Sequence, residues 1–192
     1  TKKLTKQLAI QDLSGQDPSH VAAQHNQVNM LKILRHYGNP LNLKDHSGYT
    51  PALLAAENSS FSVLEYLIDS KVDLSATLRP KSHIYNPNRK EATLLTILID
   101  TDNQSDQVLA IFNQIRKLHP KLLYMTLKDN STIFHHIAMR GKEAFLHATL
   151  PYMENSQKTR KLLTAANAQD KTPLDICAGN GLNELRLSLI HI

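Results

Sequence analysis

The sequence predicts an all-α protein built from stacked helix-turn-helix repeats. The composition is the first reason: 41% of the 192 residues are hydrophobic, only 5% are aromatic and Trp is absent. A core of aliphatic and small side chains suits closely packed helices. The second reason is a turn-helix-turn-helix pattern over residues 45–74, much of which recurs 33 residues earlier in the chain. A fixed period of this length is typical of a repeat array.

The recurrence lies in residues that begin, end and pack helices. The equivalent pairs are Asp12 and Asp45, Ser14 and Ser47, Gly15 and Gly48, Pro18 and Pro51, Ala22 and Ala55, Ala23 and Ala56, Leu31 and Leu64, Leu34 and Leu67, and Leu41 and Leu74. Thr50 and Asp17 are good N-caps, and the Pro that follows each fits the first helical turn. Both residue types therefore predict a helix start at the same place in each repeat.

We expect about five repeats in a single domain that covers residues 1–192, with approximate bounds of 12–44, 45–75, 91–126, 129–166 and 170–192. Apolar periodicity predicts second helices that include residues 28–37, 61–68 and 106–118. An amphipathic run from Glu143 should stop at or before Pro151. Residues 1–11 are predicted to cover the open face of the first repeat. The first residue, Thr1, suggests a fragment of a longer protein.

Polar residues 76–90 interrupt the period and are predicted to form an enlarged loop between the second and third repeats. This insertion carries a secondary basic cluster: Arg79, Lys81, Tyr85, Arg89 and Lys90. Such a cluster can bind an acidic protein segment or a phosphate group. It can equally be a solvated loop without a partner.

Three motifs identify a family. Residues 172–181 read Thr-Pro-Leu-x-x-x-Ala-x-x-Gly, residues 132–141 read Thr-x-Phe-His-x-x-Ala-x-x-Gly, and residues 45–51 read Asp-x-x-Gly-x-Thr-Pro. With these motifs the chain resembles the ankyrin-repeat family. The resemblance implies an ankyrin-repeat solenoid that binds a protein partner on its concave face. At the motif's turn position, where glycine supplies a left-handed backbone, the five repeats have Gly15, Gly48, Glu91, Asn130 and Asp170. Glu does not readily adopt a left-handed backbone, so we expect a reshaped third turn.

The reactive side chains do not form a catalytic or metal-binding pattern. His20 and His135 occupy the histidine position of the motif, where the family resemblance implies a structural hydrogen bond between neighbouring repeats. His135 and His136 point about 100° apart on a helix and cannot share one metal ion unaided. The lone Cys177 takes a motif Ala position, which favours a buried thiol. We therefore predict no catalysis, no metal and no cofactor.

The resemblance also implies the contact residues: the one before each motif Thr and the two after the Ala pair. These are Gln16, Gln24, His25, Tyr49, Glu57, Asn58, Asp100, Thr101, Ser131, Met139, Arg140, Lys171 and Asn180, and His46 at the second turn joins them. Tyr49, Met139 and Arg140 are expected to contribute most. An exposed aromatic ring, a pliable thioether and a planar cation are side chains that anchor interfaces.

Three functions remain open on the sequence alone. The first is a protein-interaction module without catalysis. The second is a substrate-docking or regulatory domain of a larger enzyme, because the last predicted helix is apolar on more than one side, with Leu187 as an extra Leu. Diverged repeats and composition also resemble ankyrin effectors of intracellular bacteria. The third and weakest is nucleic-acid or acidic-lipid binding, since a net charge of +5 and a pI near 9.3 are only a mild bias.

The composition also indicates the cellular compartment in which the protein is expected. The chain has a single Cys, no leader of the secretory type and no long uncharged apolar run. We therefore expect a cytoplasmic protein without membrane insertion, or one in the host cytoplasm if it is a secreted bacterial effector. Contact with the rest of a longer parent chain is a further expectation.

Overall fold

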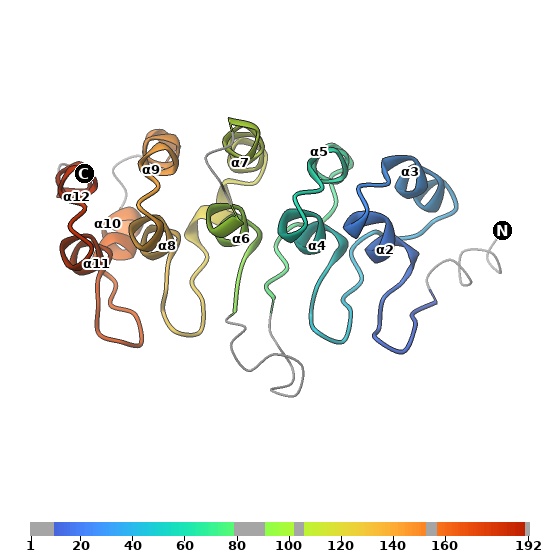
Figure 1. The fold of residues 1–192 in the computed structure, drawn as a ribbon, viewed down its shortest axis with the longest axis horizontal. Coiled ribbons are helices and arrows are strands. Elements are labelled where there is room, and N and C mark those ends of the chain that lie inside the picture. The colour runs from blue at the N-terminus through green and yellow to red at the C-terminus, as the bar shows by residue number, and fades with distance from the viewer. Residues whose placement is uncertain (1–9, 79–90, 102–105, 153–156, 191–192) are drawn as a thin grey trace. The chain divides into compact units, whose positions relative to one another are not determined.

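The computed structural model describes residues 10–78, 91–101, 106–152 and 157–190 (Figure 1). These residues form helices joined by turns, and the β-type pairing among them is one isolated antiparallel bridge between Leu78 and Ala92. The chain divides into two compact parts, an N-terminal part of residues 1–101 and a C-terminal part of residues 102–192. The predicted third repeat has its first helix in the former and its second helix in the latter.

The N-terminal part holds two complete helix pairs and one further helix. They are α2 (Pro18–Gln24), α3 (Val28–His36), α4 (Pro51–Glu57), α5 (Phe61–Asp69) and α6 (Leu94–Thr101). Helix α4 packs between α2 and α6, while α3 packs on α2 and α5 packs on α4. Figure 1 shows α2, α4 and α6 nearly end-on in a row. The predicted helix pairs of the first two repeats are confirmed.

The C-terminal part repeats this arrangement with added elements. It contains α7 (Asp106–Leu118), η1 (Pro120–Tyr124), α8 (Ile133–Arg140), α9 (Glu143–Thr149), η2 (Leu150–Tyr152), α10 (Gln157–Thr164), α11 (Pro173–Gly179) and α12 (Asn183–Ile190). Helix α8 packs on α9 and α11, α11 packs on α12, and α7 packs on α9. The sequence did not predict η1 or α10, which are short elements within the connections between repeats. Helix α10 packs against α11 and η1, and it buries Leu162 and Leu163.

The first helices begin where the caps predict. One carboxylate oxygen of Asp17 accepts the backbone N–H groups of Ser19 and His20 at 3.0 and 3.2 Å, which satisfies donors that an N-terminal turn leaves unpaired. Thr50 accepts the N–H of Leu53 in the same way at 3.4 Å. The Ala pairs then let neighbouring first helices approach closely, since Ala56 and its counterpart Ala23 are fully buried.

Left-handed residues shape the turns before the first helices. Gly15 and Gly48 have φ of 80° and 89°, and Asn130 and Asp170 take the same state at 58° and 55°. The third turn departs from this pattern. Glu91 is not left-handed, and its neighbour Ala92 forms the isolated bridge to Leu78 instead. The predicted difference in the third turn is therefore confirmed, because Glu cannot take this conformation cheaply.

A second left-handed position joins the two helices of a repeat. It is occupied by Asn26, Ser59, Gly141 and Gly181, with φ of 53°, 55°, 63° and 69°. Each of these residues lies in the turn that reverses the chain between the first helix of a repeat, the inner helix, and the second helix, the outer helix. In the first repeat, Asn26 also accepts the N–H of Val63 from the next repeat at 3.1 Å.

Candidate partner-binding surface

Two histidines connect neighbouring repeats from inside. The Nε2 atom of His20 lies 3.1 Å from the carbonyl oxygen of Tyr49, and the Nε2 atom of His135 lies 3.1 Å from the carbonyl oxygen of Lys171. A carbonyl oxygen only accepts, so both Nε2 atoms carry a proton. Each acceptor belongs to the residue before the Thr that begins the next repeat. The predicted structural role of both histidines is thus confirmed.

The cap residue raises the pKa of His20. Its Nδ1 atom lies 2.7 Å from Oδ1 of Asp17, a charge-assisted contact that favours a protonated ring. Burial would lower the pKa of His20, but the hydrogen bond and the charge of Asp17 outweigh it and raise the pKa above 6.5. Burial likewise opposes the charge on Asp17, whose pKa is nevertheless about 2 because His20, Ser19 and Asn39 donate to its carboxylate.

His135 has a neutral cap and the opposite shift. Its Nδ1 atom accepts the backbone N–H of Thr132 at 3.0 Å, which is the hydrogen bond of a neutral ring. Burial is the largest influence, and the nearby His136 adds to it, so the pKa of His135 falls below 6.5. The two histidines thus share one geometry, but their pKa values shift in opposite directions.

The structure corrects the prediction made for Tyr49. We expected an exposed ring at the turn tip, but Tyr49 is only 2% exposed. Its N–H donates to Oδ1 of Asp45 at 2.8 Å, and its hydroxyl group donates to Oε1 of Glu57 at 3.0 Å. The ring therefore packs inside the second repeat and stabilises it. The expectation that Tyr49 is an exposed anchor is wrong.

Other predicted residues of the N-terminal part lie at the surface. At the ends of α2, α4 and α6 the exposed side chains are His25, Asn58 and Asp100, and Gln24, Glu57 and Thr101 beside them are partly exposed. Because α4 packs between α2 and α6, these helix ends form one row. The hydroxyl group of Ser60 donates to the carbonyl oxygen of Gln24 at 3.3 Å and joins the first two repeats there.

The turn tips of the first two repeats are also tied together. The backbone N–H of His46 donates to the carbonyl oxygen of Ser14 at 2.9 Å, and the amide of Gln16 reaches Asp45 at 3.4 Å. The ring of His46 remains exposed, whereas Gln16 is half-buried. These contacts fix the spacing of the tips while leaving His46 available to a partner.

The C-terminal part presents a different set of side chains. Met139, 42% exposed, and Arg140 lie at the end of α8, and Lys171 and Asn180 lie before and after α11. Ser131 is the exception, since it is only 3% exposed and its hydroxyl group donates to Asp129. Ser131 was predicted to contact a partner, but it stabilises its own turn instead.

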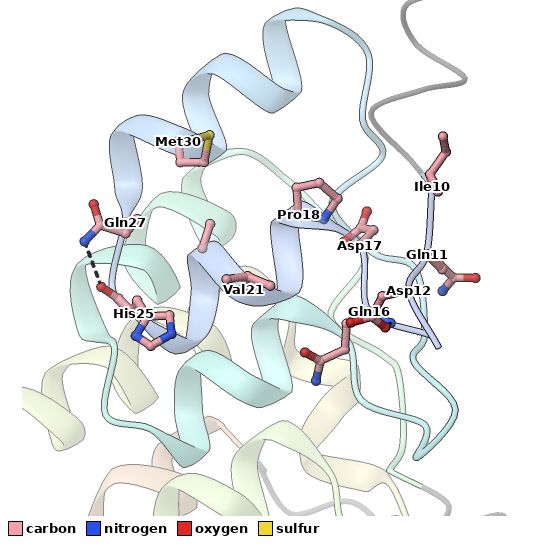
Figure 2. Close-up of a pocket in the computed structure, with 11 residues that line it drawn as sticks. Ile10, Gln11, Asp12, Gln16, Asp17, Pro18, Val21, His25, Gln27 and Met30 are labelled. Atoms are coloured by element: carbon pink, nitrogen blue, oxygen red, sulfur yellow. Dashed lines mark hydrogen bonds between the residues drawn. The ribbon is translucent and has the colours of Figure 1, made fainter. Parts of the chain in front are cut away.

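A surface pocket of about 530 Å³ opens beside α2 (Figure 2). Gln16 and His25, both predicted contacts, lie at its edge. Val21 and Met30 form part of its apolar lining. The sequence did not single out these two residues, although the 33-residue period aligns Val21 with Leu54 and Met30 with Val63 of the second repeat.

The described residues offer no sign of reactive chemistry. Cys177 is buried, and burial raises the pKa of its thiol. Within the described ranges no three His, Cys, Asp or Glu side chains are arranged to hold a metal ion. A search of the same ranges finds no helix with the length and hydropathy that a membrane span requires. The predicted basic cluster at residues 79–90 lies outside the described residues.

Comparison with known proteins finds a match in the N-terminal part of the chain. A family model for ankyrin repeats, in three copies, matches residues 2–77. These residues contain ankyrin repeats. This finding confirms the resemblance carried by the motifs, and ankyrin repeats generally mediate protein–protein interactions. The idea that the protein is a bacterial effector remains a prediction.

A solved structure extends the similarity over nearly the whole chain. It is a chain from the structure of a predatory endopeptidase from Bdellovibrio bacteriovorus in complex with an immunity protein. The match has a TM-score of 0.74 and 18% sequence identity, and it covers 99% of this chain and 90% of that chain. At this identity the likeness shows the fold, which is the predicted repeat solenoid.

Proposed function

We propose that the protein is a non-catalytic interaction module, and that a partner protein binds across the ends of the first helices and the neighbouring turn tips. In the N-terminal part the proposed contacts are Gln16, Gln24, His25, His46, Glu57, Asn58, Asp100 and Thr101. In the C-terminal part they are Met139, Arg140, Lys171 and Asn180.

One observation carries this proposal. His20 and His135 occupy equivalent buried positions and make the same hydrogen bond to the backbone of the next repeat. The exposed side chains at the ends of the first helices, in contrast, differ from repeat to repeat. Those side chains are His25, Asn58 and Arg140. A constant interior with a varied polar edge supports recognition, since polar and aromatic side chains give specificity while the interior holds their spacing.

The chemistry of the two sets supports a protein partner. The C-terminal set places Met139 beside Arg140, and a pliable thioether with a planar cation is a common anchor in protein interfaces. The N-terminal set contains the carboxylates of Glu57 and Asp100. Acidic side chains repel a phosphate backbone, so this row favours a protein over a nucleic acid.

The test begins with capture of partners on the immobilised chain and identification of a protein that binds reproducibly. Its affinity is then measured by calorimetry for the wild type and for Met139→Ala with Arg140→Ala. We expect the double change to weaken binding by about tenfold or more. The matched control is Lys32→Ala with Arg35→Ala, which removes two exposed cations from the outer helix α3.

Hydrogen exchange adds a readout that does not depend on one side chain. Binding should protect amides near residues 24–25, 57–58 and 139–140 more than amides of α3 and α5. Protection confined to the outer helices, or an unchanged affinity of the Met139 and Arg140 variant together with no protection at 24–25 and 57–58, would contradict the proposal.

A further inference from the structure

The net positive charge of the chain comes from two stretches of its C-terminal part. Residues 107–128 and 157–169 together contain seven Lys or Arg residues and no Asp or Glu, whereas the rest of the chain has fifteen basic and seventeen acidic residues. The two stretches hold most of α7 and all of η1 and α10. The charge of +5 is therefore a local feature of the molecule and not a general bias.

The two stretches adjoin in space. Helix α10 packs on η1, and η1 packs on α7. The cations that these elements expose to solvent are Lys117 on α7, Lys121 on η1, and Lys158, Arg160 and Lys161 on α10. We call this surface the basic band and define it by these five residues. It lies within the C-terminal part and shares no residue with the proposed partner-binding surface.

The described residues do not neutralise the cations of α10. Within the described ranges no carboxylate forms an ion pair with Lys158, Arg160 or Lys161. Lys158 also lies in the first turn of α10, where the positive end of the helix dipole disfavours a cation. This charge works against the stability of the helix, and an external anion would relieve it.

The apolar side of α10 is already occupied within the fold. Leu162 and Leu163 are buried, and the helix packs against α11 and η1. A basic amphipathic helix binds a lipid surface by burying its apolar side in the bilayer. Because α10 has no apolar side to offer, a membrane is not the ligand that fits this band.

Two features favour a protein segment over a nucleic acid. Asp129 and Asp170 follow η1 and α10 in the chain and are exposed at neighbouring turn tips, where the N–H of Ala168 donates to the carbonyl oxygen of Asp129 at 2.7 Å. A continuous phosphate backbone would meet these like charges at the end of the band. Leu118, beside Lys117, is 53% exposed and offers an apolar contact that a protein side chain can use.

We propose that the basic band binds a short acidic segment of a partner protein. Several Asp or Glu side chains of the segment lie against the cations, and one apolar side chain covers Leu118. Carboxylates form charge-assisted hydrogen bonds with lysines and a two-pronged pair with the guanidinium group of Arg160. This inference goes beyond the proposed function, because it uses another surface and adds a second contact.

The test is fluorescence anisotropy with the intact chain and a labelled peptide of Glu residues with a Leu at its centre. The same peptide with Gln in place of every Glu is the uncharged probe. The band variant carries Lys158→Glu, Arg160→Glu and Lys161→Glu. All three side chains are exposed, so the fold should survive, and circular dichroism melts check this.

A control variant separates the band from the total charge. It carries Lys32→Glu, Lys71→Glu and Arg186→Glu at exposed positions outside the band, so its net charge equals that of the band variant. The wild type and the control should bind the acidic peptide alike, and the band variant should bind it about tenfold more weakly or worse. Leu118→Ser should weaken binding of this peptide but not of one with Ser at its centre.

Three results would overturn the inference. One is a wild type that binds the acidic peptide no better than the Gln peptide. Another is an equal loss of binding in the band and control variants, because total charge then explains the contact. The third is tighter binding, lost in the band variant, of a duplex oligonucleotide or of phosphatidylserine vesicles at the same salt concentration, which assigns the band to that ligand instead.

Discussion

The Nδ1 atom of His20 lies 2.7 Å from Oδ1 of Asp17, and neither side chain is exposed to solvent. The contact joins a buried carboxylate to a histidine whose pKa it raises. Removal of His20 would take away one of the groups that compensate the buried charge of Asp17, which is costly. The fourth repeat keeps the histidine but caps its helix with Thr132, so a hydroxyl group takes the place of the carboxylate there.

The two histidines should titrate on opposite sides of their ordinary value. We expect the pKa of His20 to lie above 6.5 and the pKa of His135 to lie below it. Asp17→Asn should lower the pKa of His20 and leave that of His135 unchanged, because it removes only the charge beside His20. Histidine nuclear magnetic resonance titrations measure both. Equal values for the two rings would show that the cap does not set their charge.

Acid should weaken the fourth repeat through His135. Its pKa is lower in the folded state than the 6.5 of the unfolded chain, so the unfolded chain takes up the proton first as the pH falls. Stability is then lost as the pH falls below 6.5. His135→Gln should flatten this loss in urea unfolding measured across that range. A variant that keeps the full slope would count against His135 as its source.

His20 should act in the other direction. Its raised pKa gives stability that is complete below pH 6.5 and is lost as the pH rises through the folded value. His20→Gln should therefore cost more stability just below pH 6.5 than well above it. The effect of Asp17 lies at lower pH, because its contribution is present above 3.8 and disappears as the pH falls towards about 2.

Substitution of Tyr49 should test its buried role. Tyr49→Ala should lower the free energy of unfolding by about 3–5 kcal/mol, since it leaves a large cavity in the second repeat. Tyr49→Phe should cost only about 1 kcal/mol, because it removes the hydrogen bond to Glu57 and keeps the ring. Urea unfolding measures both. A Tyr49→Ala variant of normal stability would mean that the ring is exposed after all.

Three glycines give a graded test of the turns. An added Cβ at Gly15, with φ of 80°, would lie 2.6 Å from the backbone N of His46, so Gly15→Ala should cost at least about 2 kcal/mol. Gly181 has φ of 69° but open space, and Gly181→Ala should cost about 1 kcal/mol. Gly179 is helical with open space, and Gly179→Ala should be neutral or stabilise by about 0.5–1 kcal/mol. A different order in urea unfolding would contradict these backbone assignments.

Much of the fold follows from local signals in the sequence. Helix α7, Asp106–Leu118, has the predicted bounds, because a 13-residue amphipathic run leaves little freedom in its placement. Pro51 and Thr50 likewise fix the start of α4. Helix α10 was missed because Gln157–Thr164 is short and polar, and its two buried leucines gain their environment only from α11 and η1.

The candidate surface was less predictable than the fold. Position in the motif identified His25, Asn58, Met139 and Arg140 as surface residues, but it could not show that Tyr49 turns inward. That orientation depends on the hydroxyl bond to Glu57, eight residues away and on the next helix. The sequence position of a side chain therefore indicated where it is attached, and tertiary contacts decided where it points.

The left-handed residue between the paired helices also affects how much each repeat contributes to the free energy of unfolding. Gly141 and Gly181 take this backbone state at little cost, whereas Ser59 carries roughly 1–2 kcal/mol of local strain there. In an array whose stability is a sum over repeats and their interfaces, such strain stays local. The second repeat can therefore be made more stable by a single replacement. Ser59→Gly would remove this backbone strain without altering any side chain that is proposed to contact a partner.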